Sequence, residues 1–140
     1  MSLQISKLGK RYGDVAVFSD ISLAVGSGEF VAIVGESGVG KSTLLNCMAG
    51  LDSWDSGRVS LDGVDIGGLN DEQRSLMRRR QIGFVFQALH VWPHLDVAQN
   101  VGLPLMLLQA SDRATHDQRV RDMLAAVGLN GLGGRLPQQL

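Results

Sequence analysis

Residues 33–45, IVGESGVGKSTLL, place three glycines, one lysine and two hydroxyl side chains between two apolar runs. The segment from Gly35 to Ser42 fits the pattern G-x-x-x-x-G-K-[ST]. Glycines let the backbone approach a phosphate chain closely, so that successive N–H groups point toward it. The pattern therefore predicts a phosphate-binding loop (P-loop) for a nucleoside triphosphate.

Two side chains of this loop carry specific chemistry. We expect the ammonium of Lys41 to contact the β- and γ-phosphates and to stabilise charge there, and the hydroxyl of Ser42 to ligate Mg²⁺. The alternative is a glycine-rich turn with an exposed lysine, which a strand before the loop and a helix after it argue against. The predicted nucleotide-binding residues of the loop are Gly35, Glu36, Ser37, Gly38, Val39, Gly40, Lys41, Ser42 and Thr43.

Apolar patterning predicts the elements that position the loop. Phe30–Val34 is a continuous apolar run typical of a strand buried on both faces, and Lys41–Leu51 is expected to be a helix that ends near Gly50. Ile82–Gln87 is expected to be a second buried strand, and Val15–Val25 has the period-two spacing of a strand. Alternating strands and helices predict an α/β fold with a mostly parallel sheet, preceded by an antiparallel piece.

Three helical features follow. Asn70–Arg80 is expected to be a helix with a capping box between Asn70 and Gln73, acids early and arginines late. Pro104 is expected to interrupt a helix. Ser111–Gly128 is expected to be an amphipathic helix. Its apolar side is predicted to comprise Val120, Met123, Leu124 and Val127.

Composition narrows the class of protein. The 140 residues have the size of one domain, and the formal net charge of -1 argues against a protein that mainly coats nucleic acid or an anionic membrane. A single cysteine, Cys47, excludes an internal disulfide, favours a reducing compartment and is expected to be a small packed residue. The N-terminus lacks an apolar signal-peptide region, and no apolar run approaches the roughly 18 residues of a membrane span, so we expect a soluble chain.

Other nucleotide-binding motifs help to discriminate among P-loop proteins. A small GTPase would need N-K-x-D, but the four asparagines are followed by Cys, Asp, Val and Gly. An apolar strand ending in aspartate is missing too, because the best candidate after the P-loop, IGFVF, is followed by Gln87.

From about Leu3 to Leu140 the sequence resembles the nucleotide-binding domain of ABC transporters. Three stretches carry the resemblance: residues 10–63, LNDEQRSLMRRRQIGFVFQ and PHLDVAQNVGLPL. The resemblance implies that Tyr12 stacks on adenine and that Gln87 is the Q-loop glutamine, which touches Mg²⁺ and links to a transmembrane partner. Within the family the sequence is similar to the branch of lipoprotein-releasing, macrolide-exporting and cell-division ATPases. Val91-Trp92-Pro93 departs from the Leu-Leu-Pro common in that branch.

The resemblance also implies a fold. It is an α/β P-loop NTPase (RecA-like) core with an N-terminal antiparallel β-subdomain and the start of a helical subdomain, as an incomplete domain spanning 1–140. Residues of about 1–90 would form the β-subdomain and the core up to the Q-loop, and about 91–140 the start of the helical subdomain. In the family a signature motif follows P-x-x-L, which here is the end of the 140 residues, so we predict that this chain alone does not hydrolyse ATP.

The implied cofactors are ATP and Mg²⁺. The implied partners are a transmembrane permease subunit, contacted through Gln87–Leu95, and a second copy in a homodimer of the full-length domain, with no nucleic acid. Such a protein would lie in the cytoplasm, peripheral on the inner face of the cell membrane. The alternative is a soluble, non-transport ABC-type P-loop ATPase or nucleotide-binding module, as in repair or translation, because Gln87 and its loop occur in both classes.

For three features of the sequence, a structural explanation stands beside the functional one. Tyr12 could be a half-buried core tyrosine rather than a base platform. Trp92 could be a core residue or could face the membrane partner. Arg78–Arg80 is better explained as the C-terminus of a helix with a solvated face than as a nucleic-acid patch, because the net charge is near zero.

Overall fold

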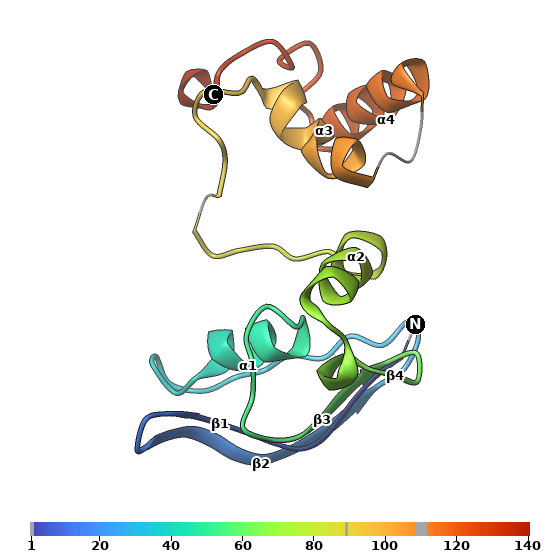
Figure 1. Cartoon of the computed structure of the whole chain (residues 1–140). Helices are drawn as coiled ribbons and strands as arrows, with labels where there is room; N and C mark the ends of the chain where they lie inside the picture. The colour runs from blue at the N-terminus through green and yellow to red at the C-terminus, as the bar shows by residue number, and fades with distance from the viewer. Residues whose placement is uncertain (1, 89, 109–111) are drawn as a thin grey trace. The chain divides into compact units, whose positions relative to one another are not determined.

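The structure, a computed structural model, describes residues 2–88, 90–108 and 112–140 and divides into two compact units, Met1–Gly83 and Phe84–Leu140 (Figure 1). The first unit contains β1 (Leu3–Tyr12), β2 (Val15–Val25), α1 (Lys41–Met48), β3 (Ser56–Leu61), β4 (Val64–Asp65), the 3-10 helix η1 (Ile66–Gly68) and α2 (Asp71–Gln81). The second contains α3 (Val97–Leu108), α4 (Arg113–Ala126) and the 3-10 helix η2 (Pro137–Gln139). The predicted assignment of a β-subdomain and core and of a helical subdomain to parts of the chain stays a prediction.

The strands of the first unit form one antiparallel sheet in the order β2-β1-β3-β4. β1 and β2 are a hairpin in which Tyr12 pairs with Val15, and Gly13 takes a positive φ of 58° in the turn. This sheet confirms the predicted antiparallel piece near the start of the chain, and β2 spans the predicted range Val15–Val25.

The sequence does not predict β1, because the residues that this strand buries do not alternate regularly along it. Its pairing shifts register several times, and the three consecutive residues Leu8, Gly9 and Lys10 are all buried. A strand turns every second residue to one face, and the extra residue of β1 between Ile5 and Leu8 shifts this alternation, so that Leu8 and Lys10 face the same side as Ile5. This bulge of β1 thereby brings Lys10 into the interior.

The core of the first unit lies between the sheet and two helices, and Figure 1 shows α1 and α2 on one side of the sheet. Leu44 and Cys47 of α1 and Met77 of α2 pack in one cluster with apolar residues of β1 and β3. Arg78 also links the helices, because its Nη1 donates to the carbonyl oxygen of Gly50 at 2.6 Å. The helix that follows the phosphate loop is therefore fixed on the sheet and at its C-terminal end.

The capping box of α2 is confirmed. The Asn70 side chain accepts from the Gln73 N–H at 2.9 Å, and the Gln73 side chain accepts from the Asn70 N–H at 3.0 Å. Arg78–Arg80 fill the last turn, as predicted for a helix C-terminus, where cations complement the helix dipole.

Both predicted buried strands, Phe30–Val34 and Ile82–Gln87, are wrong for this structure: neither segment is a strand. Phe30 is 93% exposed and Val85 96% exposed, although Ile33 packs against the core of its unit. A strand forms only where a neighbouring strand accepts its backbone hydrogen bonds. Within the described residues no strand pairs with either run, so the predicted parallel sheet does not form there.

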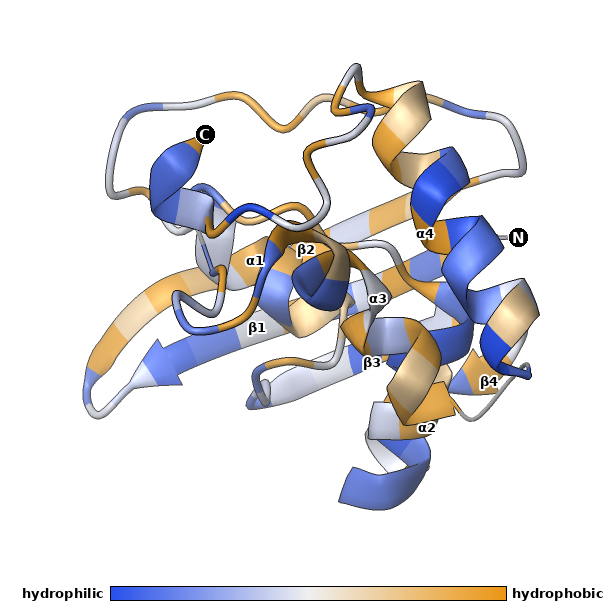
Figure 2. Cartoon of the chain, turned by 90° about the horizontal axis from the view of Figure 1, so that it is seen from above, coloured by the Kyte–Doolittle hydropathy of each residue, from blue (hydrophilic) through white to orange (hydrophobic). Residues whose placement is uncertain are grey.

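In the second unit α3 and α4 pack around Val97, Val120 and Leu124. Figure 2 shows that hydrophilic residues predominate along α4, with hydrophobic ones between them. The predicted interruption at Pro104 is wrong, because α3 continues through it. Pro104 is exposed, so its ring projects toward solvent rather than into the α3–α4 contact.

The apolar side of α4 is narrower than predicted. Val120 and Leu124 are buried, whereas Met123 is 57% exposed and Val127 68% exposed. Among the described residues α3 is the helix that packs on α4, and a contact with one helix buries residues spaced by four rather than a wide face. The predicted start of this helix, Ser111, lies outside the described residues; Gly128, the predicted stop, follows the end of α4 with a φ of 77°.

Two predictions from composition can be compared with the structure. Cys47 is completely buried in the core, which confirms it as a packed residue. Across the ranges that the structure describes, no helix combines the length and the apolar character needed to cross a membrane.

Candidate nucleotide-binding site

The predicted phosphate loop leads directly into α1. The helix begins at Lys41, and the Leu44 N–H donates to the Gly40 carbonyl oxygen at 2.9 Å. The first N–H groups of a helix have no acceptor within the helix and attract anions, together with the positive end of the helix dipole. The start of α1 thus provides the electrostatics that the sequence motif predicts.

Glycine is required at two places in the loop. Gly38 and Gly40 have φ angles of 82° and 98°, in the region that L side chains rarely adopt. A Cβ on Gly40 would also lie 2.6 Å from Cγ1 of Val17 in β2. The absence of a side chain therefore lets the loop pass close to the sheet just before the helix starts.

Lys41 folds back over its own loop. Its ammonium donates to the carbonyl oxygens of Gly35, at 2.9 Å, and Glu36, at 2.6 Å. These contacts hold a positive charge beside the backbone that is predicted to surround the phosphates. The residues that would bind a phosphate chain, from Gly35 to Thr43, are thereby brought together by the local fold.

The hydroxyl residues Ser42 and Thr43 follow in the first turn of α1, where Ser42 is exposed. In the part of the chain that the structure describes, no group of three or more His, Cys, Asp or Glu side chains could hold a metal ion. Mg²⁺ commonly takes few protein oxygens and completes its shell with phosphate oxygens and water. One exposed hydroxyl beside a phosphate loop fits that kind of coordination.

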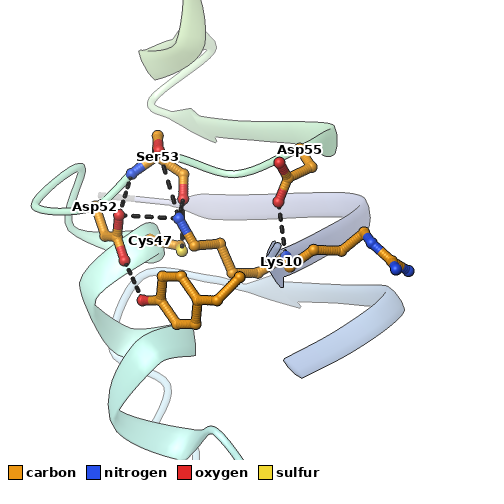
Figure 3. A network of polar contacts seen from close by, with 7 residues as sticks. Lys10, Cys47, Asp52, Ser53 and Asp55 are labelled. Carbon is orange, nitrogen blue, oxygen red and sulfur yellow. Dashed lines mark hydrogen bonds and ion pairs between the residues drawn. The ribbon is translucent and has the colours of Figure 1, made fainter. Parts of the chain in front are cut away.

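Tyr12 ends β1 and is 55% exposed, so it is not a core residue. Its hydroxyl donates to Oδ2 of Asp52 at 2.8 Å, and the ammonium of Lys10 lies over its ring, 4.8 Å from the ring centroid (Figure 3). The aromatic surface that the sequence assigned to a base is therefore exposed and also fixed by two charged neighbours.

Lys10 is the residue that sequence reasoning missed. It is only 5% exposed, and its ammonium donates to Oδ1 of Asp52 at 3.0 Å and to the carbonyl oxygen of Ser53 at 2.7 Å. A buried ammonium requires such partners, because it loses its hydration. The spacing Lys10-x-Tyr12, which places both side chains on one face of a strand, is the only sequence signal for this contact.

The pKa shifts follow from these contacts. The pKa of Asp52 is lowered, chiefly because its carboxylate accepts from the Tyr12 hydroxyl, with Lys10 adding to the effect against desolvation. The pKa of Tyr12 is raised by the same hydrogen bond and by desolvation, while the Thr43 hydroxyl acts in the opposite direction. For Lys10, desolvation acts to lower the pKa, but the hydrogen bond and charge of Asp52 outweigh it and the pKa is raised.

The loop that carries Asp52 is attached on both sides. The Cys47 thiol of α1 donates to the Ser53 carbonyl oxygen at 3.4 Å, and the pKa of this thiol is raised, first by burial and then by the charge of Asp52. On the strand side, Oδ2 of Asp55 accepts from the Arg11 N–H at 2.7 Å. The loop thereby connects the helix of the phosphate loop to the strand that carries Tyr12.

Gln87, the other predicted metal contact, is exposed and belongs to the second unit. A few residues later Trp92 is 61% exposed, which argues against the core alternative. Asn100 of α3 organises this segment, because its side chain bonds both the N–H and the carbonyl oxygen of Trp92, at 2.8 and 3.0 Å, and the carbonyl oxygen of Leu95 at 3.0 Å.

A glycine loop that opens a helix, with a lysine folded over it, defines the P-loop class of α/β proteins. The sequence profile described as ABC transporter matches residues 18–140. The chain therefore belongs to the ABC transporter family.

Relatives in the curated proteins include the lipoprotein-releasing system ATP-binding protein LolD of Bordetella pertussis, 43% identical over 99% of this chain and 62% of its own length. The sulfate/thiosulfate import ATP-binding protein of Cucumis sativus is 40% identical over 100% of this chain and 39% of its own length. The chain thus spans less than two thirds of the length of these relatives.

Among solved structures, the chain is similar to the ATP-binding cassette MJ0796. A dimeric structure of its post-hydrolysis state, bound to ADP and Pi, has a TM-score of 0.89 and 32% sequence identity, covering 99% of this chain and 62% of that one. A second dimeric structure of the same cassette has a TM-score of 0.90. The agreement confirms the predicted fold class.

Proposed function

We propose that the chain is the ATP-binding part of an ABC-type transport ATPase, which couples ATP binding and hydrolysis to export or release through a membrane partner. The observation that carries this proposal is the loop Gly35–Gly40, which opens α1 with Lys41 folded over its backbone. The similarity to a lipoprotein-releasing ATP-binding protein supports release, although import ATP-binding proteins are also among the relatives.

The residues divide into a phosphate end and a base end. Residues Gly35–Thr43 cradle the phosphates, and the ammonium of Lys41 stabilises the negative charge on them, because a charge-assisted hydrogen bond is stronger than a neutral one. Tyr12 offers its exposed ring to the adenine base, which stacks on it. The solved cassette bound to ADP and Pi supports a nucleotide as the ligand.

Mg²⁺ would be held by the Ser42 hydroxyl, with Gln87 as a second protein contact and phosphate oxygens completing its shell. When bound, the ion supplies positive charge that neutralises the phosphates during transfer. The chain's own contribution is to place an oxygen donor one residue after Lys41, at the start of α1.

The proposed partners are a transmembrane permease subunit and a second copy of the full-length domain. The segment Gln87–Leu95 is proposed to contact the permease. Two features make this segment suitable for docking: Trp92 is exposed, and the Asn100 side chain holds its backbone. Dimeric cassettes among the solved structures support the homodimer. The protein would then lie at the inner face of the cell membrane, with residues of about 1–90 as the β-subdomain and core up to the Q-loop and about 91–140 as the start of the helical subdomain.

Binding of a fluorescent ATP analogue with Mg²⁺ to the 140-residue chain tests the proposal. We expect Lys41→Ala to weaken binding by about tenfold to a hundredfold, because a bond to a charged group contributes about 1.5–3 kcal/mol. Lys7→Ala, which removes the same charge from an exposed position in β1, is the matched control and should bind like the wild type. Equal affinities of the Lys41 variant and the wild type would refute the proposal.

A further inference from the structure

The network of Lys10, Tyr12, Asp52 and Ser53 lies at the base end of the proposed site, outside the loop Gly35–Thr43 (Figure 3). Lys10 and Tyr12 lie two residues apart in β1, so both side chains project from the same face of the strand. Asp52 contacts both through different oxygens, at 3.0 Å from the Lys10 ammonium and 2.8 Å from the Tyr12 hydroxyl. One carboxylate therefore fixes two side chains at once.

The two faces of the Tyr12 ring have different surroundings. The ammonium of Lys10 lies over one face, 4.8 Å from the centroid, and Lys10 is itself buried. Tyr12 nevertheless remains 55% exposed, so a large part of its surface is open to solvent. A planar base needs one free face for stacking, while a cation over the other face attracts the ring electrostatically.

We propose that Lys10 and Asp52 are positioning residues for nucleotide binding, which fix the Tyr12 ring so that only the face turned away from Lys10 accepts the base. This inference rests on the proposed function, because it presupposes that a nucleotide base stacks on Tyr12. A ring fixed in advance loses less rotational freedom when the base binds, which strengthens binding without any new contact.

The same network sets the distance between base and phosphates. Asp52 and Ser53 follow α1, and the Ser53 carbonyl oxygen accepts from both Cys47 of α1 and Lys10 of β1. The strand that carries the Tyr12 ring is thereby attached to α1, whose first turn belongs to the phosphate loop. Loosening the network should weaken binding of ATP but not of a phosphate chain without a base.

Two probes separate these effects: ATP and inorganic tripolyphosphate, each with Mg²⁺ and measured by calorimetry on the 140-residue chain. The variants are Tyr12→Phe, which keeps the ring and removes its bond to Asp52, and Asp52→Asn, which also weakens the bond to Lys10. Asp55→Asn is the matched control, because it removes a charge from the same loop while the Asn oxygen can still accept from the Arg11 N–H and keep the loop attached to β1.

We expect Tyr12→Phe to weaken ATP binding about threefold and Asp52→Asn about tenfold, with tripolyphosphate affinity unchanged in both. The double variant Tyr12→Phe/Asp52→Asn should bind ATP no more weakly than Asp52→Asn, because both changes act on the same hydrogen bond between Tyr12 and Asp52. Asp55→Asn should bind both probes like the wild type. If Tyr12→Phe and Asp52→Asn bind ATP like the wild type while Tyr12→Ala weakens it, the positioning role is wrong and the base platform stands. If Tyr12→Ala has no effect, the base platform itself fails.

A spectroscopic signature checks the contact directly, because Tyr12 is the only tyrosine. Absorbance titration should show that Asp52→Asn lowers the pKa of the phenol toward its ordinary value, while Asp55→Asn leaves it raised. An unchanged pKa of the Tyr12 phenol in Asp52→Asn would overturn the proposed contact between Tyr12 and Asp52. Circular dichroism monitors folding of each variant. If Asp52→Asn does not fold, the ATP affinity of Tyr12→Phe decides whether the network has a positioning role.

Discussion

The phosphate end and the base end of the proposed site are built in different ways. The phosphate end is one contiguous segment, Gly35–Thr43, whose lysine bonds to carbonyl groups five and six residues earlier. The base end joins Tyr12 to Asp52, 40 residues apart, through a carboxylate that also pairs with a buried lysine. Contiguous chemistry can be recognised in a sequence, whereas a network of this kind depends on which loop the fold places beside which strand.

The largest expected effect lies at the phosphate end. Gly40→Ala should destabilise the chain by about 3 kcal/mol, combining an unfavourable positive φ with the overlap between its Cβ and Val17. Gly38→Ala is the matched control, because its φ is also positive but a Cβ there has no neighbouring atom within 4 Å. Urea denaturation measures both, and equal losses would show that the close approach to β2 contributes nothing.

The base end gives the next largest effect. Asp52→Ala should cost about 2 kcal/mol of unfolding free energy, because it leaves the Lys10 ammonium buried without its carboxylate. Arg58→Ala, which breaks the exposed pair with Asp65, should cost less than about 0.5 kcal/mol. Chemical denaturation of both variants makes the comparison. A loss as large for Arg58→Ala would mean that burial does not distinguish the two pairs.

The same contact predicts how stability depends on pH. The pKa of Asp52 is lowered in the folded chain, so its contribution is present above the unfolded value of about 3.9 and is lost as the pH falls through the folded value. The pKa values of Tyr12 and Lys10 are raised, so their contributions are present below their unfolded values of about 10 and are lost at higher pH. The stability difference between wild type and Asp52→Ala should therefore narrow below about pH 4, and a constant difference at acid pH would contradict this assignment.

The two ends also show what the sequence can predict. The loop, the start of α1 and the capping box of Asn70 and Gln73 follow from short-range patterns, and the structure contains all three. The roles of Lys10 and Asp52 could not be predicted, because a bulge disturbs the alternation of β1 and Asp52 lies far from Lys10 along the chain. The strands predicted at Phe30–Val34 and Ile82–Gln87 failed for a related reason: apolar character alone does not supply a neighbouring strand.

The smallest expected effect concerns base preference. Stacking on Tyr12 does not read the hydrogen-bonding edge of a purine, so ATP and GTP should compete within about tenfold, which is a difference of about 1.4 kcal/mol. Competition for a fluorescent analogue measures the ratio, and Tyr12→Ala should weaken both nucleotides alike. A preference for ATP of about a hundredfold would show that another group reads the base.

Amide chemical shifts test the division into two ends most directly. Adding ATP and Mg²⁺ to the isotope-labelled chain should shift the backbone signals of residues 35–43 and of Tyr12. Inorganic tripolyphosphate should shift the signals of residues 35–43 and leave that of Tyr12 near its free position. Loop signals that do not respond to either ligand, or a Tyr12 signal that shifts equally with both, would contradict the account.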